Sequence, residues 1–161
     1  MQAELNQMLA LYRAAVTNAR RQGGFQCKSD KNYFDPGRSI LHRIFGHGKK
    51  APPGNCADWA RVTWGALVTR TWNCWRVVKI RARRMFFKDS HNFVYITPRC
   101  GGGKRIIFDP YLDADKPNGK NIWNENVEPF WLTDAWYEWW IFYPLAEHAP
   151  GAPPANPGSA P

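Results

Sequence analysis

The sequence of 161 residues contains no apolar stretch of the roughly 20 residues needed to cross a bilayer. Even the run from Trp136 to Leu145 is interrupted by Glu138. The N-terminus has no apolar block and carries Glu4 and Gln7, which is not typical of a secretory signal. We therefore expect no membrane span, and either a cytoplasmic location or export by a secretion system that needs no signal peptide.

Cysteine is scarce as well, with four residues and no CxxC pair. His42 and His47 lack further ligands at metal-binding spacing, so we expect neither a structural zinc site nor another cofactor. If one cysteine is catalytic, an odd number remains. We therefore expect a reduced protein or a single disulfide bridge, and not a disulfide scaffold.

Acidic side chains are rare in the first two thirds of the chain. Residues 1–105 hold 20 basic and five acidic residues, a net charge of +15, whereas residues 106–161 have a net charge of −6. Such an asymmetry steers a protein toward anionic partners such as nucleic acid, a membrane surface or a cell-wall polymer. Within residues 76–84, Lys79, Arg81 and Arg83 alternate with apolar residues, which predicts a strand with one buried and one basic face. No nucleic-acid-binding motif accompanies it, so nucleic acid is not the expected partner.

Apolar residues make up 44% of the chain and include nine tryptophans, which is sufficient for one domain of ordinary size. We assign residues 1–148 to a single domain. Residues 149–161 contain five prolines, two glycines and no charge, so we expect a disordered tail there.

Periodicity and turn residues predict the order of the elements. Apolar residues at helical spacing between Leu5 and Ala19 predict an amphipathic helix that ends at Gly23–Gly24. Residues 22–54 are rich in glycine, proline and charge and are interpreted as a long loop with a short helix near residues 39–45. A second helix is expected from Cys56 to about Arg70. Strands are expected near residues 75–82, 91–98, 104–109 and 139–143, with a polar segment at residues 113–126.

A candidate nucleophile lies at the start of the second helix. The segment 52–60 is typical of a loop that places Cys56 in the first helical turn, with Asn55 as the N-cap. Backbone N–H groups and the positive end of the helix dipole stabilise a thiolate there, and no other cysteine of this chain has that context. Asp58 would favour the neutral thiol, so we expect its carboxylate to point away from the sulfur.

A candidate base and a candidate carboxylate flank a predicted hairpin. His91 opens a segment rich in β-branched and aromatic residues, and the turn at Gly101–Gly103 leads to a second strand that ends at Asp109–Pro110. In an antiparallel hairpin the two residues near the open end are neighbours in space. Asp109 is therefore placed to orient the His91 imidazole.

Each of the three residues also has an ordinary structural interpretation. A lone cysteine is most often a small buried hydrophobe, a lone histidine a satisfied polar group, and Asp-Pro a turn. Their joint order and placement favour a catalytic triad.

These motifs together resemble the transglutaminase-like group of the papain-like cysteine hydrolases. The resemblance spans residues 54–112 and rests on Gly-Asn-Cys-Ala-Asp-Trp-Ala, His-Asn-Phe-Val-Tyr-Ile and Ile-Phe-Asp-Pro-Tyr. It implies an α+β papain-like (transglutaminase-like) fold in which a catalytic helix packs on an antiparallel sheet. It also implies that Cys56 is the nucleophile, His91 the general base and acid, and Asp109 the orienting carboxylate. The resemblance does not place the side chain of the oxyanion hole.

The expected function is cysteine-dependent acyl transfer on protein or peptide amide bonds, as a protease, deamidase or transglutaminase. A small basic chain with this chemistry suits a bacterial effector or toxin, for which a cognate inhibitor or immunity protein would be a partner. One alternative is a peptidoglycan amidase of papain-like fold. The alternative outside the enzymes is a basic nucleic-acid-binding module.

Overall fold

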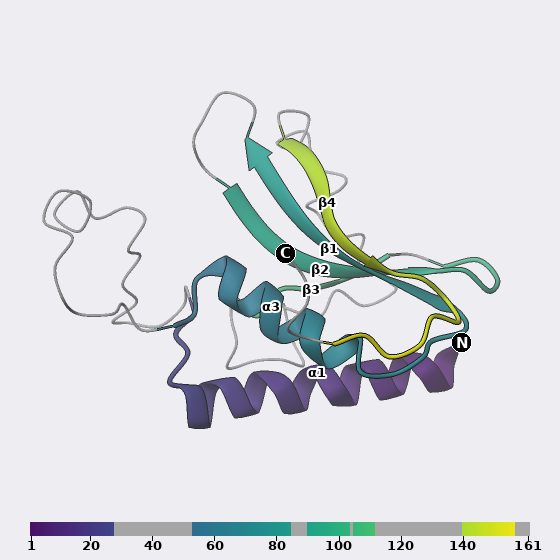
Figure 1. Ribbon diagram of the computed structural model, residues 1–161, viewed down its shortest axis with the longest axis horizontal. Helices are drawn as coiled ribbons and strands as arrows, with labels where there is room; N and C mark the ends of the chain where they lie inside the picture. The colour runs from purple at the N-terminus through teal and green to yellow at the C-terminus, as the bar shows by residue number, and fades with distance from the viewer. Residues whose placement is uncertain (28–52, 85–89, 104, 112–139, 157–161) are drawn as a thin grey trace, which may run out of the picture.

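The computed structural model of the protein describes residues 1–27, 53–84, 90–103, 105–111 and 140–156 (Figure 1). These residues form the helices α1 (Gln2–Gly23) and α3 (Cys56–Leu67) and the strands β1 (Trp75–Arg84), β2 (Ser90–Pro98), β3 (Ile106–Phe108) and β4 (Trp140–His148). The strands form an antiparallel sheet in the order β3-β2-β1-β4. The predicted α+β class is confirmed. The short helix expected near residues 39–45 and the polar segment 113–126 lie outside the described residues.

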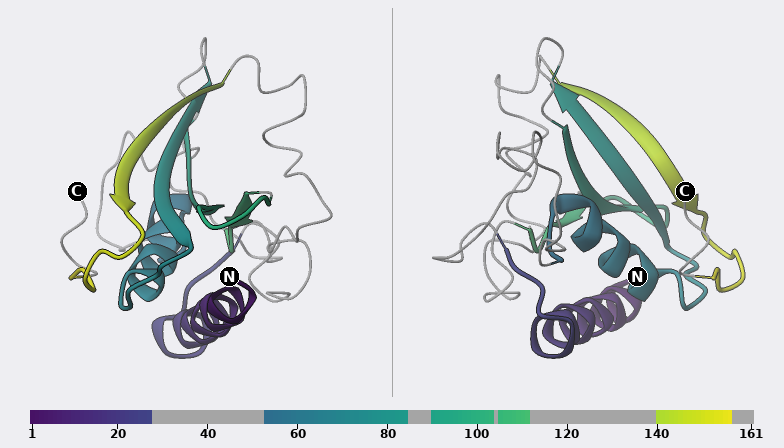
Figure 2. Two further views of the ribbon diagram at one scale, coloured as in Figure 1. Left: turned by 90° about the vertical axis from the view of Figure 1, so that its right-hand side faces the viewer. Right: turned by 60° about the vertical axis from the view of Figure 1, so that its left-hand side comes forward.

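The helices lie on one side of the sheet. α3 packs against β1 and β2, and α1 packs along α3 (Figures 1 and 2). α1 ends as predicted, because Gly24 adopts the left-handed conformation, with φ 61°, and its N–H bonds to Ala19 O. Within the described residues, no helix is long and apolar enough to cross a bilayer.

Side chains on the two faces of the sheet form separate buried clusters. The cluster on the helix side joins both helices to the sheet and includes Tyr12, Trp59, Val77, Val94 and Phe108. The cluster on the other face comprises Val78, Ile80, Ala82, Phe93 and Ile107. This alternation along β1 and β2 determines which side chains of these strands face α3.

β4 lies at one edge of the sheet and is longer than the strand predicted at residues 139–143. It continues through Pro144, which is paired with Ile80, and Leu145 is the extra residue where the register shifts. Proline lacks an N–H group and is therefore tolerated at edge strands and bulges, so Pro144 does not end this strand.

The basic face expected on β1 does not form as predicted. The apolar residues are buried, but Lys79 is also only 5% exposed because it shares the helix-facing side with Val77. Burial, together with the nearby charge of Arg61, lowers the pKa of Lys79. Arg81 is exposed, and the side chain of Arg83 lies outside the described part. Lys79 is therefore not available to a nucleic-acid-binding face.

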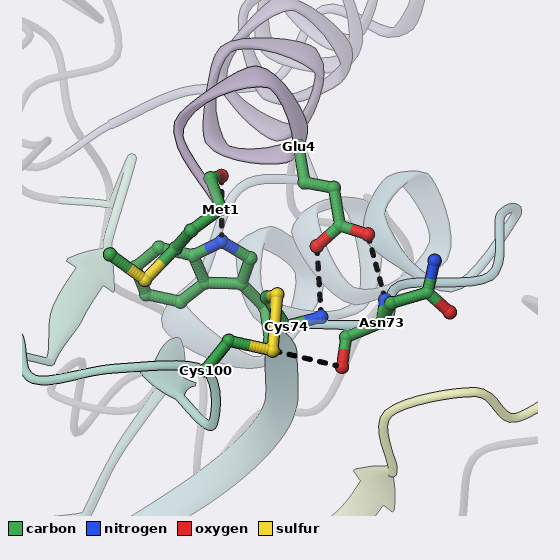
Figure 3. The surroundings of a disulfide bond; sticks show 6 residues. Met1, Glu4, Asn73, Cys74 and Cys100 are labelled. Atoms are coloured by element: carbon green, nitrogen blue, oxygen red, sulfur yellow. Dashed lines mark hydrogen bonds between the residues drawn. A yellow bond between two sulfur atoms is a disulfide. The ribbon is translucent and has the colours of Figure 1, made fainter.

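A disulfide between Cys74 and Cys100 ties the loop before β1 to the β2–β3 turn, with 4.8 Å between their Cα atoms (Figure 3). Cys27, which is buried, and Cys56 are free thiols. Of the two states that the sequence left open, the structure has the single bridge.

The first turn of α1 is bonded to the same loop. The Glu4 carboxylate accepts from Asn73 N at 2.8 Å and from Cys74 N at 2.9 Å, and Met1 O accepts from Trp75 Nε1 at 3.2 Å (Figure 3). These bonds fasten α1 to the end of the sheet where β1 begins, next to the disulfide.

Residues 149–156 run back from β4 to the C-terminal end of α3. Gly151 N donates to Trp72 O at 2.6 Å, and Ala155 N donates to Val68 O at 2.9 Å. Residues 149–156 are therefore not the disordered tail that was expected, because backbone hydrogen bonds hold this proline-rich segment in place. Residues 157–161 lie outside the described part.

Candidate functional site

The N-terminus of α3 is closed by a capping box that orients Cys56. Asn55 Oδ1 accepts from the N–H groups of Ala57 and Asp58, both at 2.9 Å. Asp58 Oδ2 accepts from Gly54 N at 3.1 Å and Asn55 N at 3.3 Å. The Asp58 carboxylate is thus directed at the preceding loop, as expected. These capping bonds do not use the Cys56 N–H.

The loop before Cys56 is held by a chain segment from the end of α1. Gln26 N donates to Pro53 O at 2.9 Å, and Trp59 Nε1 donates to Gln26 O at 2.7 Å. Gly54 adopts φ 127°, a conformation open only to glycine, and a Cβ there would overlap the backbone of Gln26. The close contact fixes where the chain enters α3.

His91 and Asp109 are brought together by the β2–β3 hairpin, as the sequence predicts. His91 Nε2 and Asp109 Oδ2 are 2.6 Å apart, and Asp109 is 2% exposed. Among the described residues, no donor reaches Asp109 Oδ1, so His91 is the described partner of this carboxylate. The imidazole stacks on Phe93 with 5.8 Å between ring centroids and contacts Tyr111 at 5.3 Å. The ring is therefore held by the carboxylate and by aromatic residues.

The Cys56 thiol lies against the start of β2. Its Sγ is 3.9 Å from Ser90 O and accepts from Asn92 Nδ2 at 3.6 Å. The His91 side chain lies close enough to this thiol to lower its pKa. Cys56, His91 and Asp109 thus form a series of neighbouring groups.

The charges of this series favour an ion pair. Burial raises the pKa of the Cys56 thiol, but the hydrogen bond and charge of His91 and the bonds from Asn92 outweigh it, so this pKa lies below its ordinary value of 9.0. Burial opposes protonation of His91, but the charge and hydrogen bond of Asp109, with a smaller contribution from Cys56, raise the pKa of His91 to about 10. The two shifts favour the imidazolium at neutral pH and make the thiolate easier to form than in an ordinary cysteine.

Asn92 is the residue near the sulfur that the sequence analysis did not single out. In the sequence Asn92 is simply a polar residue within the predicted strand, and only its bond to Cys56 Sγ distinguishes it. Within the described residues, no group of three or more His, Cys, Asp and Glu side chains is arranged to hold a metal ion. The described site contains a thiol with a lowered pKa, an imidazole with a raised pKa and a buried carboxylate, a combination suited to nucleophilic attack on a carbonyl.

Comparisons of this chain with protein-family models, curated proteins and solved structures find no match.

Proposed function

We propose that this protein is a cysteine-dependent acyl-transfer enzyme of papain-like, transglutaminase-like fold that acts on protein or peptide amide bonds. The observation that carries the proposal is the position of the Cys56 thiol, which lies at the N-terminus of α3 and against the start of β2, where His91 Nε2 is 2.6 Å from Asp109 Oδ2. In this role Cys56 is the nucleophile, His91 the general acid and base, and Asp109 the residue that orients the imidazole. A bacterial effector or toxin that modifies a target protein is the biological role that this chemistry suits.

In the acylation step the Cys56 thiolate attacks the carbonyl carbon, and a C–S bond forms while the carbonyl oxygen becomes an oxyanion. The Cys56 N–H, which the capping bonds do not use, is placed to donate to that oxygen. His91 then gives a proton to the leaving nitrogen and the C–N bond breaks. As negative charge leaves the sulfur, the contribution of Cys56 that raises the pKa of His91 is lost, which makes the imidazolium a better acid at this moment.

In the second step His91 removes a proton from water, which attacks the thioester and releases the acid and the Cys56 thiolate. Water as acceptor gives proteolysis or deamidation, whereas a lysine amine gives a crosslink. The triad is common to these reactions, so the acceptor distinguishes them.

Expression of wild type and Cys56→Ala in the cytoplasm and in the periplasm of a bacterial host tests the proposal. We expect wild type alone to produce cleaved, deamidated or crosslinked proteins that mass spectrometry detects, with Asn73→Ala, an exposed site at the far end of the sheet, behaving as wild type. Identical products from wild type and a folded Cys56→Ala variant would rule out the proposed function.

A peptidoglycan amidase is the second candidate, and the Cys74–Cys100 disulfide favours it. Disulfides persist in oxidising compartments such as the bacterial periplasm, where the cell wall is accessible. Release of stem peptides from purified peptidoglycan by wild type, without any modified protein, would select this candidate. Toxicity only in the periplasm, lost in Cys56→Ala, would agree with it.

A further inference from the structure

The Cys56 sulfur lies between two consecutive residues of β2 whose side chains project from opposite faces of the sheet. Ala82 lies opposite His91 and Arg81 opposite Asn92 in the register with β1. His91 stacks on Phe93, which belongs to the cluster on the face away from the helices. Asn92 alternates with Phe93 and therefore projects to the helix side, where its Nδ2 donates to Cys56 Sγ at 3.6 Å.

This arrangement separates the two kinds of donor that acyl transfer requires. The imidazolium must face the leaving group, while the donors to the oxyanion must lie on another side of the attacked carbon. His91 occupies the first position. The Asn92 amide approaches the sulfur from the helix side, and the Cys56 N–H lies at the positive end of α3.

We propose that Asn92 is the second oxyanion-hole donor, a catalytic residue whose side-chain amide binds the tetrahedral oxyanion together with the Cys56 N–H. This inference rests on the proposed acyl-transfer function. Asn92 is 6% exposed, so its amide is shielded from water, which strengthens a hydrogen bond to a charged acceptor. An asparagine amide does not titrate, so its N–H groups remain donors throughout the pH range of the reaction.

The movement of charge explains how one amide serves both states. In the resting site Nδ2 donates to the Cys56 sulfur, which is a weaker acceptor than an oxyanion. After attack the sulfur is bonded to the carbonyl carbon. The negative charge then lies on the oxygen bonded to that same carbon, and this oxygen is a strong acceptor. The amide therefore binds the transition state more tightly than the resting thiolate, and that difference is what accelerates the reaction.

Two probes separate this role from simple activation of the thiol. p-Nitrophenyl acetate transfers its acetyl group to Cys56, because the C–S bond forms through an oxyanion and p-nitrophenolate leaves. Iodoacetamide alkylates the same sulfur by displacement of iodide at its CH₂ group, with no oxyanion. Both rates are measured on wild type, Asn92→Leu, Asn92→Ala and the control Asn73→Ala, each at a pH where alkylation has reached its plateau. Peptide mapping confirms that Cys56 is the labelled site, and Cys56→Ala gives the background.

We expect Asn92→Leu and Asn92→Ala to lower the acetylation rate ~100 to 1000-fold, the usual effect of losing one oxyanion donor, while plateau alkylation stays close to wild type. Retained alkylation also shows that the variants are folded around the thiol, and Asn73→Ala should match wild type in both rates. Equal losses in both reactions, or acetylation that stays at the wild-type rate, would overturn the role of Asn92 while leaving acyl transfer intact. Wild type that is alkylated at Cys56 but never acetylated would instead overturn the proposed function and this inference with it.

Discussion

At the residue scale, the pKa of the Cys56 thiol is set by opposing effects. Burial disfavours the thiolate, whereas His91 and Asn92 stabilise it. His91 in turn keeps its proton because the charge and hydrogen bond of Asp109, itself buried, raise the pKa of the imidazole. The pKa of the thiol therefore depends on three other positions, and the helix dipole alone, worth up to about 1 kcal/mol at exposed sites, would not replace them.

This balance predicts the pH dependence of the thiol. The rate of Cys56 alkylation by iodoacetamide should rise with pH through a pKa below 9.0 and then level off. In His91→Gln the burial of the thiol is no longer offset by an imidazolium, so the same rise should move above pH 9.0. Acyl transfer should also fall on the alkaline side as His91 loses its proton near pH 10.

His148→Gln is the matched control, since His148 is a buried histidine that bonds to Arg70 O, outside the site. It should leave the profile of Cys56 alkylation unchanged. A profile that is the same in wild type and His91→Gln would contradict the ion pair.

At the element scale, the entry of the chain into α3 depends on contacts from a distant segment. The capping box is local in sequence, but the carbonyl and N–H of Gln26 bind Trp59 and Pro53 across more than 20 residues. The start of α3 is thus positioned by the end of the α1 segment as well as by its own cap. The bulge in β4 also depends on the position of this strand in the sheet, because an edge strand tolerates Pro144 and a central strand would not.

Gly54 is the position where this packing leaves least room. Gly54→Ala would place a residue with φ 127° and a Cβ against the Gln26 backbone, so we expect a loss of roughly 3 kcal/mol in the free energy of unfolding. A loop displaced to relieve the overlap would move Cys56, so the alkylation rate should fall as well. Urea unfolding and iodoacetamide labelling measure the two effects.

Gly102→Ala is the control for this substitution. Gly102 has open space around its Cβ position and no positive φ, so the change should stay within about 0.5 kcal/mol. Similar effects of both substitutions would argue against the close contact between Gly54 and Gln26.

At the scale of the whole molecule, the two ends of the sheet have different tasks. At one end Glu4 and Met1 fasten α1 to the start of β1, and the disulfide joins the loop before β1 to the β2–β3 turn (Figure 3). At the other end, where Ala82 lies opposite His91, the sheet carries the thiol and its partners. The cross-link is thus separated from the chemistry by the length of the β1–β2 pair.

This separation predicts that the disulfide affects stability more than reactivity. The bridge closes a loop with a sequence separation of 26, so reduction, or the double change Cys74→Ser and Cys100→Ser, should lower the free energy of unfolding by about 3.5 kcal/mol. The rate of Cys56 alkylation should remain near that of the oxidised protein under conditions where both forms are folded. Slower alkylation of Cys56 with an unchanged free energy of unfolding would contradict this prediction.

The local chemistry of the chain allowed much of the fold and site to be predicted from the sequence. The helix spacing before Gly24 gave α1, the β-branched segments gave β1 and β2, and the turn glycines gave the hairpin that joins His91 to Asp109. The Asn55 cap identified the start of α3 because a capping box is written in consecutive residues. Such features need only neighbouring positions.

The remaining features depend on contacts between distant segments. The sequence predicts that Lys79 faces solvent, but α3 covers its side of the sheet. The sequence likewise predicts a free tail, but α3 and the loop after it provide acceptors for N–H groups of residues 149–156. In the sequence Asn92 is one more strand residue, and it becomes a candidate donor only because α3 brings Cys56 to the start of β2. The sequence by itself determined the three candidate site residues and the elements that carry them, since these follow from local caps, strands and turns. Only the tertiary structure decided which groups surround the sulfur and from which side, because burial and direction are set by packing between elements.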